Sequence, residues 1–238
     1  METRDVMLWF DLDDTVWDMS GNSVLCLREL YESQGLGRWF ESHEQWDEIY
    51  HKINRELWEQ YGRGDITRDY LRSERFARPL RIGGVPPADA EVMAVTFDKL
   101  YLDSLGQKTA LVDGARELLD YLSERDYKMG IVSNGFREVQ YNKLRSSGID
   151  RYFDPVVLSD DAGINKPDRR FFDYAMERAG SRDKHNIIIG DNLTADIQGA
   201  LDAGWEAIWF CRNKESSQSD GRESYETILS LTELKKHF

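Results

Sequence analysis

In the second half of the chain, short apolar runs alternate with segments in which apolar residues recur every three or four positions. The short runs predict buried strands, and the longer spacing predicts helices that pack on them. The expected strands and helices follow one another as YKMGIVS, REVQYNKLRSSG, PVVLS, RRFFDYAMERAG, NIIIG, TADIQGALDAG and EAIWF, after a first helix GARELLDYLSERD. This alternation is typical of a parallel sheet covered on both faces, so an α/β fold is predicted.

The first apolar run, at residues 6–10, is separated from these strands by a long helical block. The four helical stretches of the block are LCLRELYESQGL, EQWDEIYHKINRELWEQYG, DYLRSERFARPL and ADAEVMAVTFDKLYLDSLG. Since the block offers no strand as a partner, the first strand must join the later sheet. The pattern therefore predicts a Rossmann-like, doubly wound parallel sheet core at residues 1–20 and 107–238, with an all-helical cap domain inserted at residues 21–106. A polar loop, ESSQSDGRES, then precedes a short strand and a final helix.

Composition narrows the possible functions. A formal charge of -13 argues against a nucleic-acid binder, whose affinity depends on Lys and Arg. Cys26 and Cys211 are far apart in the sequence, which makes a disulfide framework improbable. Glu2 and Asp5 lie where a signal peptide carries positive charge, and no apolar run approaches the length of a membrane span. We therefore expect a soluble, cytoplasmic protein.

Three carboxylates, Asp11, Asp13 and Asp14, follow the first apolar run in the segment FDLDDT. Acidic residues after a strand are common turn formers and helix caps, so this cluster read alone favours a structural role. Residues two apart in an extended segment share a side. Asp11 and Asp13 can therefore face one site, while Asp14 points elsewhere.

Two later strand ends carry groups that suit an anion. Ser133, Asn134 and Gly135 close the strand in IVSNGF, where a hydroxyl and backbone N–H groups suit either a helix cap or a phosphate. Lys166 precedes Pro167 in GINKPD. Such a lysine is ordinarily a solvated charge, but beside carboxylates it becomes a cation able to stabilise an anionic group.

The fourth strand end, IIIGDNLTAD, adds two more acids. Asp191 directly follows the apolar run, and Asp196 comes about one helical turn later. With Asp11 and Asp13, four carboxylates would gather at one edge of the sheet, where like charges repel one another. A hard divalent cation with oxygen ligands resolves this repulsion, and the pattern therefore predicts bound Mg²⁺.

In this order and spacing the four strand ends resemble the motifs of the haloacid dehalogenase superfamily of aspartate-nucleophile phosphohydrolases. DLDDT resembles its first motif, Ser133 its second, Lys166 its third and GDNLTAD its fourth. The helical insertion is similar to the C1-type cap, so the resemblance covers essentially the whole chain. Within the superfamily, LWEQYGRGDITRDYLRSERF and NKPDRRFFDYAMERAG look like the bacterial pyrimidine 5'-nucleotidase group.

The resemblance implies catalytic roles for Asp11, Asp13 and Lys166. Asp11 would be the nucleophile, and Asp13 would protonate the leaving oxygen and later take a proton from water. The Mg²⁺ ion would be held by the Asp11 carboxylate, the Asp13 backbone carbonyl and Asp191. Asp196 would act from behind these ligands, and Lys166 would face the phosphoryl group.

The resemblance also implies a phosphate-binding set made of Ser133, Asn134, Gly135 and Thr15. The Ser133 hydroxyl and the Asn134 backbone N–H would hold phosphoryl oxygens, and the Thr15 hydroxyl would cap the turn and help to orient Asp13. Substrate choice would lie in the cap, where the glycine-containing loop at residues 62–67 is the segment best able to approach a ligand.

The expected function is a magnesium-dependent phosphomonoester hydrolase that forms an aspartyl-phosphate and prefers pyrimidine nucleoside 5'-monophosphates. Its partner would be a small phosphorylated metabolite, with no nucleic acid and no membrane, and the protein would be a monomer or a small homo-oligomer. Four competing functions stay open. Two of them are a phosphoglycolate phosphatase-like phosphatase of sugar or other metabolite phosphates and a β-phosphoglucomutase-like phosphomutase. The third is a 2-haloacid dehalogenase, against which Asp13 counts. The fourth is a noncatalytic phosphate-receiving switch, against which the cap counts.

Overall fold

The computed structural model describes residues 3–212 and 224–238, and the chain divides into two compact units. One unit is formed by Met1–Met19 together with Thr109–Phe238, and the other by Ser20–Lys108. The polar loop expected at residues 215–224 lies outside the described residues, apart from Ser224.

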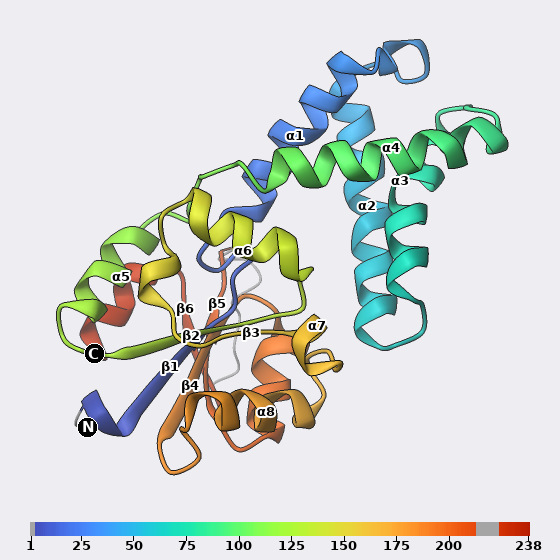
Figure 1. The fold of residues 1–238 in the computed structure, drawn as a ribbon. Helices are drawn as coiled ribbons and strands as arrows, with labels where there is room; N and C mark the ends of the chain where they lie inside the picture. Colours follow the sequence, from blue (N-terminus) through green and yellow to red (C-terminus); the bar gives the residue numbers. More distant parts are fainter. Residues whose placement is uncertain (1–2, 213–223) are drawn as a thin grey trace. The chain divides into compact units, whose positions relative to one another are not determined.

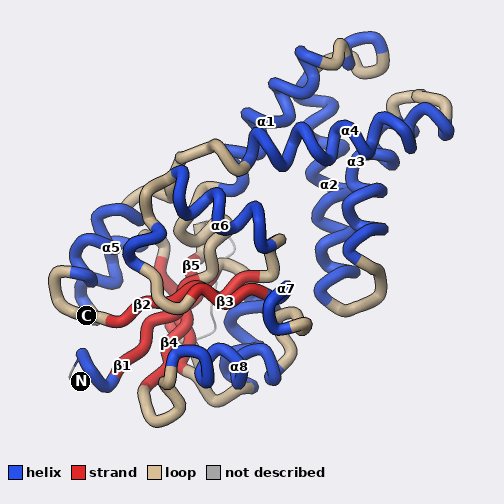
Figure 2. Tube along the Cα trace, in the orientation of Figure 1, coloured by secondary structure: helices blue, strands red, loops and turns tan. Residues whose placement is uncertain are grey.

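A six-stranded parallel sheet forms the centre of the first unit (Figures 1 and 2). Its strands, in the spatial order β3-β2-β1-β4-β5-β6, are Val156–Leu158, Lys128–Ser133, Val6–Phe10, His185–Gly190, Glu206–Phe210 and Glu226–Ile228. The first strand of the sequence is thus central, between β2 and β4, which confirms that it joins the later strands. The arrangement confirms the predicted Rossmann-like α/β fold.

Helices lie on both faces of this sheet, with α5 and α6 on one side and α8 on the other (Figures 1 and 2). The helices of this unit are α5 (Ala115–Ser123), α6 (Arg137–Ser146), α7 (Ser159–Ala162), α8 (Arg169–Ala179) and α9 (Gly199–Asp202). Shorter turns are η1 (Thr3–Asp5), η3 (Asp150–Tyr152), the π-helical η4 (Leu193–Gln198) and η6 (Leu231–Lys236). Because both faces are covered, all five residues of β1 are buried and apolar.

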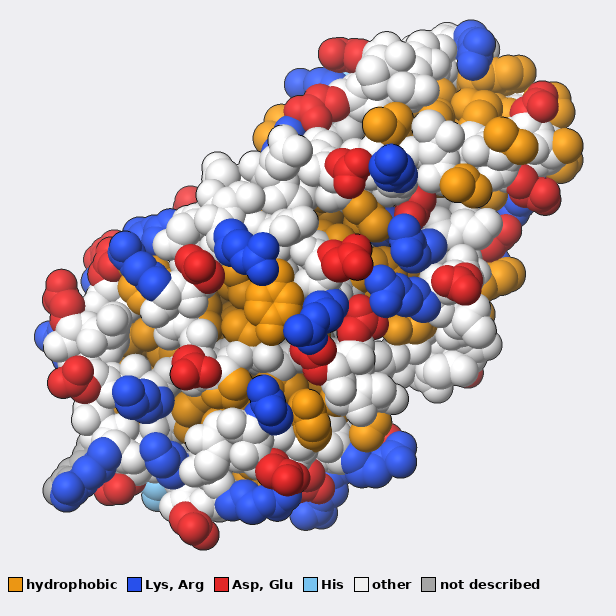
Figure 3. All heavy atoms as spheres, in the orientation of Figure 1, with side chains coloured by type: hydrophobic (Ala, Val, Ile, Leu, Met, Phe, Trp, Pro, Cys, Tyr) orange, Lys and Arg blue, Asp and Glu red, His pale blue; other side chains and the backbone are white. Residues whose placement is uncertain are grey.

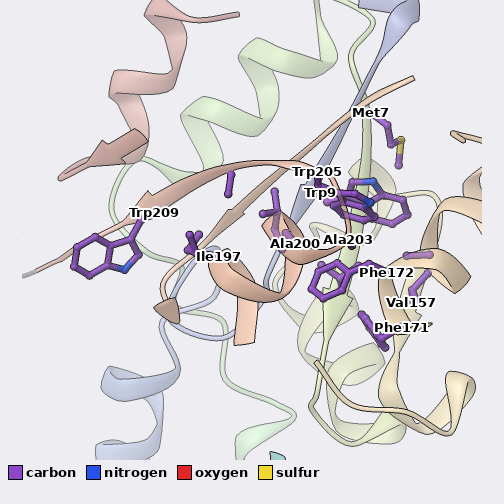
Figure 4. Packing of buried hydrophobic residues seen from close by; sticks show 14 of the residues in the cluster. Met7, Trp9, Val157, Phe171, Phe172, Ile197, Ala200, Ala203, Trp205 and Trp209 are labelled. Atoms are coloured by element: carbon purple, nitrogen blue, oxygen red, sulfur yellow. The ribbon is translucent and has the colours of Figure 1, made fainter. Parts of the chain in front are cut away.

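An aromatic cluster fixes β1 against α8 and the start of β5 (Figure 4). Trp9 stacks on Trp205, with ring centroids 5.3 Å apart, and Phe172 meets Trp205 edge-on at 5.2 Å. The Trp9 indole N–H donates to Asn186 Oδ1 at 2.9 Å, so its polar group is satisfied inside the core. β1 is therefore held on its face by packing and on its edge by pairing with β4.

The order of the strands reverses between β1 and β4. The chain builds outward from β1 through β2 to β3, and then crosses to build β4, β5 and β6 on the other side. In open α/β sheets, ligands bind beyond the carboxyl ends of the strands at this switch point. The residues that follow β1 and β4 therefore occupy the position where a site is expected.

The second unit consists of four helices around an aromatic core. They are α1 (Met19–Ser33), α2 (His43–Gly62), α3 (Arg68–Ile82) and α4 (Pro87–Leu105), with a short turn η2 (Leu36–Arg38). The rings of Trp46, Tyr50, Phe76, Phe97 and Tyr101 pack on one another. Helix α1 begins at Met19, before the apolar spacing that starts at Leu25. Polar Ser23 interrupts that spacing although it lies on the buried face of the helix, where it shares a 2.8 Å hydrogen bond with the Tyr101 hydroxyl.

Charged side chains of both signs are interspersed on the face that Figure 3 shows. Within residues 3–212 and 224–238, no helix is both long enough and apolar enough to cross a membrane.

A buried ion pair ties α3 to α4 inside the second unit. Asp98 accepts hydrogen bonds from Arg72 Nη2 at 2.6 Å and from Arg75 Nε at 2.9 Å, and Arg75 is buried with it. A buried guanidinium that loses its carboxylate keeps the cost of its desolvation. Asp98 therefore stabilises the helical unit chiefly by compensating Arg75.

We expect Asp98→Asn to lower the free energy of unfolding by about 3 kcal/mol, because the amide no longer compensates the buried guanidinium. Urea denaturation of the whole chain, followed by circular dichroism, measures this change. Asp103→Asn is the matched control, since Asp103 is an exposed residue of the same helix and its substitution should cost less than about 0.5 kcal/mol. Equal losses in the two variants would contradict the assignment.

Candidate active site

The ends of β1 and β4 bring three carboxylates together. The two strands pair in register, Phe10 opposite Ile189, and the Asp11 N–H donates to the Ile189 carbonyl at 3.0 Å. One oxygen each from Asp11, Asp191 and Asp196 lies within 4.8 Å of the others. The structure thus gathers three of the four acids expected at this edge, while the fourth, Asp13, turns its carboxylate toward α6.

The turn after β4 positions Asp196. Asn192 caps η4, its side-chain oxygen accepting from the Thr194 and Ala195 N–H groups at 3.0 and 2.8 Å. The Asn192 backbone N–H in turn donates to Asp196 Oδ2 at 3.1 Å. A Cβ at Gly190 would lie 2.5 Å from the same oxygen, so only glycine admits the carboxylate here.

Lys166 joins this cluster as its central cation. Its Nζ donates to Asp11 Oδ1 at 2.7 Å, to Asp196 Oδ1 at 2.6 Å and to the Val132 carbonyl at 2.8 Å. The side chain is only 2% exposed. Three acceptors therefore satisfy the three protons of the ammonium group.

The Asn134 side chain holds the backbone of Lys166 in place. Asn134 Nδ2 donates to the Lys166 carbonyl at 2.9 Å, and the Lys166 N–H donates back to Asn134 Oδ1 at 2.8 Å. The sequence suggested only a backbone role for Asn134. The reciprocal pair adds a structural one, because it connects the end of β2 to the segment that carries the lysine.

The acids outnumber the cation that holds them. Burial raises the pKa of Asp11 to about 7, an effect that Lys166 opposes and that Asp196 and Asp13 reinforce. The pKa of Asp191 is also raised well above its ordinary value, by burial of the carboxyl group and by Asp11 and Asp196. Burial alone would lower the pKa of Lys166, but Asp11 and Asp196 outweigh it and raise that pKa. A second positive charge would therefore stabilise the cluster.

The donor set suits Mg²⁺, which takes hard oxygen ligands and keeps several waters. Both oxygens of Asp196 already accept hydrogen bonds, from Lys166 and from the Asn192 N–H. Asp11 and Asp191 are thus better placed to supply ligand oxygens, with Asp196 orienting Lys166 behind them. The Thr15 hydroxyl donates to Asp191 Oδ1 at 3.3 Å, so it contacts a carboxylate of the cluster.

Ser133 is the last residue of β2, and Gly135 lies in the turn that follows it. The Ser133 hydroxyl oxygen accepts from Gln140 Nε2 at 2.7 Å and from the Gly135 N–H at 3.1 Å. Its own proton remains available for an anionic acceptor. A Cβ at Gly135 would collide with the Gln140 side chain, so glycine is required for this contact.

The Asp13 carboxylate is held by two residues that were not predicted from the sequence. Lys143 Nζ lies 2.7 Å from Asp13 Oδ1, and Gln140 Nε2 donates to Asp13 Oδ2 at 3.0 Å. Both belong to α6, whose buried residues are Val139, Gln140, Lys143 and Leu144. The sequence did contain a signal for such a contact, because two polar residues three positions apart lie within the apolar stripe of this helix.

Asp14 lies in the tight turn that follows, with a left-handed backbone at φ 59°. Its carboxylate pairs with Arg212 at 3.0 Å, and the same guanidinium reaches Asp18 at 3.1 Å. Arg212 was also missed, because nothing in the sequence marks a lone arginine after the last long strand as a partner of this turn.

Comparison with known proteins gives consistent matches. A family model described as haloacid dehalogenase-like hydrolase matches residues 8–210. The putative HAD-hydrolase YfnB of Bacillus subtilis is 33% identical over 95% of this chain and 92% of that protein. A crystal structure of YfnB bound to magnesium superposes with a TM-score of 0.83, at 31% identity and 97% coverage of both chains.

Two further relatives carry named activities. The pyrimidine 5'-nucleotidase PynA of Streptococcus pneumoniae is 31% identical, over 95% of this chain and 92% of that protein. The glyceraldehyde 3-phosphate phosphatase of Methanothermobacter thermautotrophicus is 28% identical, over 94% of this chain and 93% of that protein.

We expect the affinity for Mg²⁺ to fall as the pH is lowered from about 8 to about 6, by up to tenfold per unit for each displaced proton. The metal-free protein binds a proton on Asp11 below its pKa of about 7, and a cation must displace that proton. Isothermal titration calorimetry in buffers of different ionisation enthalpy measures both the affinity and the proton release. An affinity that does not change across this range, with no proton released, would contradict the expectation.

Proposed function

Because the chain belongs to the haloacid dehalogenase-like hydrolase family, we propose that it is a magnesium-dependent phosphomonoesterase. The observation that carries this proposal is the environment of Asp11. Asp11 is 8% exposed, and its carboxylate lies at the switch point of the sheet, near both Lys166 and Asp191. A nucleophilic carboxylate beside a buried cation and a further carboxylate suits attack on a phosphoryl group.

The proposed reaction has two halves. In the first, an Asp11 oxygen attacks phosphorus, the bond to the leaving oxygen breaks, and Asp13 gives that oxygen a proton. In the second, water attacks the aspartyl-phosphate, Asp13 takes a proton from the water, and the bond to Asp11 breaks. The products are an alcohol and inorganic phosphate. The carboxylate of Asp11 and the acid of Asp13 are thus both restored after each turnover.

The remaining residues bind and orient. The Ser133 hydroxyl donates its proton to a phosphoryl oxygen, and the positive charge of Lys166, whose three protons already have acceptors, stabilises the negative charge that shifts during transfer. Asp11, Asp191 and the Asp13 backbone carbonyl would hold Mg²⁺, which when bound neutralises phosphate charge. Asp196 keeps Lys166 in position, and the Thr15 hydroxyl keeps Asp191 in position.

The substrate we propose is a nucleoside 5'-monophosphate, with a preference for pyrimidines. PynA, whose name states this activity, aligns along nearly the whole chain. The helical unit would choose the base, and the loop at residues 62–67 remains our candidate for contact with the leaving group. The helical stretch 21–106 is proposed as a separate cap domain, with the core made of residues 1–20 and 107–238.

A second candidate is a phosphatase of small sugar phosphates. The alignment with a glyceraldehyde 3-phosphate phosphatase, at 28% identity over 94% of this chain, favours it over a dehalogenase or a phosphomutase. A dehalogenase has less support, because a halide leaves as a stable anion and needs no acid such as Asp13. A phosphomutase would use the same residues but would accumulate a sugar bisphosphate.

We expect pyrimidine monophosphates to give the highest kcat/KM in a magnesium-containing panel of UMP, dUMP, dTMP, purine monophosphates, glyceraldehyde 3-phosphate and several further sugar phosphates. Release of inorganic phosphate is the measurement. Sugar phosphates that lead by more than about tenfold, or about 1.4 kcal/mol in transition-state binding, would replace the nucleotidase with the second candidate. Absence of phosphate release from every substrate would sink the phosphatase proposal itself.

We expect Asp11→Asn to lower kcat by at least about a thousandfold, because the amide is a poor nucleophile and cannot form the intermediate. Asp5→Asn is the control, since Asp5 is an exposed residue at the other end of β1 and its substitution should leave kcat unchanged. Steady-state phosphate release measures both. Full activity in Asp11→Asn would disprove the assigned nucleophile.

A further inference from the structure

We propose that Lys143 and Gln140 of α6 are positioning residues that hold the Asp13 carboxylate for proton transfer. The inference rests on the proposed phosphatase function and assigns two residues outside the strand-end motifs. Each of them binds one oxygen of Asp13, Lys143 at 2.7 Å and Gln140 at 3.0 Å. A carboxylate held at both oxygens by one helix has a defined orientation.

Lys143 is a buried cation that pairs with the Asp13 carboxylate. Its side chain is 3% exposed, and a buried ammonium group is costly unless an anion compensates it. Its Nζ also lies 4.6 Å from the centre of the Trp17 ring and 3.6 Å from Met19 Sδ. The residues from Asp13 to Trp17 form a tight turn, in which the Asp14 N–H donates to the Trp17 carbonyl at 2.8 Å. One ammonium group therefore fixes both the acid and the far end of the turn that carries it.

Gln140 turns its NH₂ group toward Asp13 and leaves its own carbonyl oxygen without a hydrogen bond among the described residues. The side chain is fully buried, and its NH₂ group donates to both Asp13 Oδ2 and Ser133 Oγ. Its Oε1 is buried without a hydrogen-bond partner among the described residues. A carboxylate only accepts hydrogen bonds, so it dictates that the NH₂ side of the amide faces it. An unsatisfied carbonyl oxygen is the cost of that orientation.

The two acids are thus held by separate supports. Lys166 binds Asp11 from one side of the sheet's switch point, and α6 binds Asp13 through Lys143 and Gln140. An acid that protonates a leaving oxygen must stay in place relative to the nucleophile, because proton transfer requires hydrogen-bond distance. The contacts with α6 supply this constraint for Asp13.

The consequence depends on the leaving group. An alkoxide needs a proton as it departs, whereas 4-nitrophenolate is a stable anion and departs without one. Loss of positioning should therefore slow phosphoryl transfer from an alkyl phosphate and spare transfer from 4-nitrophenyl phosphate. A defect in phosphate binding or folding would slow both. The second half-reaction, which needs Asp13 as a base, should slow for both substrates.

The test compares first-turnover rates by rapid quench, with 4-nitrophenyl phosphate and with the alkyl phosphate that the wild-type protein hydrolyses best. For Lys143→Met we expect a first-turnover loss of about a hundredfold with the alkyl phosphate but less than about threefold with 4-nitrophenyl phosphate. The substrate concentration that gives half of the maximal first-turnover rate should change little. A burst of 4-nitrophenol before a slow steady state should appear. Lys143→Arg, which keeps the cation, should recover most of the alkyl phosphate rate.

Two further variants make the test independent of one substitution. Gln140→Met changes no charge and should slow the alkyl phosphate more than 4-nitrophenyl phosphate, although the second rate also falls because Gln140 holds Ser133 as well. Arg145→Met removes one positive charge from an exposed position of the same helix and should change neither rate. Equal losses with the two substrates, or none, in Lys143→Met and Gln140→Met would overturn the inference alone. Failure of the wild-type protein to hydrolyse either substrate would instead overturn the proposed function, and this inference with it.

Discussion

The candidate site depends on one buried ammonium group. Lys166 holds Asp11 after β1, Asp196 after β4 and the carbonyl of Val132 in β2, so a single cation connects three neighbouring strands at their carboxyl ends. Each carboxylate alone would be too costly to bury, and the lysine would be as well. Together they form a core in which the lysine offsets much of the negative charge, and Asp191 adds a further carboxylate to it. That surplus is the physical basis for proposing a divalent cation at this site.

The rest of the first unit keeps these groups in place. β1 is central in the sheet, and its Trp9 is stacked on Trp205 and hydrogen-bonded to Asn186. The side chain of Asn134 then sets the backbone of Lys166, and Gly190 leaves the space into which Asp196 fits. Packing therefore positions β1, and hydrogen bonds position the loops that carry Lys166 and Asp196. The carboxylates and the ammonium group are held together by both.

Much of this could be predicted, because the carboxyl ends of parallel strands meet at one edge and a strand's apolar run shows where it ends. That reasoning placed Asp11, Asp191 and Lys166 near one another. It failed for the Asp13 carboxylate, since the two-residue alternation of a strand stops at the tight turn that begins there. Gln140 and Lys143 were missed because a polar residue in an apolar stripe does not indicate which residue it contacts. Ser23 obscured the start of α1 in the same way, since its contact with Tyr101 cannot be read from the sequence pattern.

The amide of Gln140 has a wider consequence. It donates to Asp13 and to Ser133 at once, so the proposed acid and the proposed phosphate-binding hydroxyl share one support. Neither can shift without disturbing the other. If Asp13 and Ser133 have the proposed roles, a change of substrate is accommodated more easily elsewhere in the molecule than at this shared support, because a shift there would alter both proton transfer and phosphate binding.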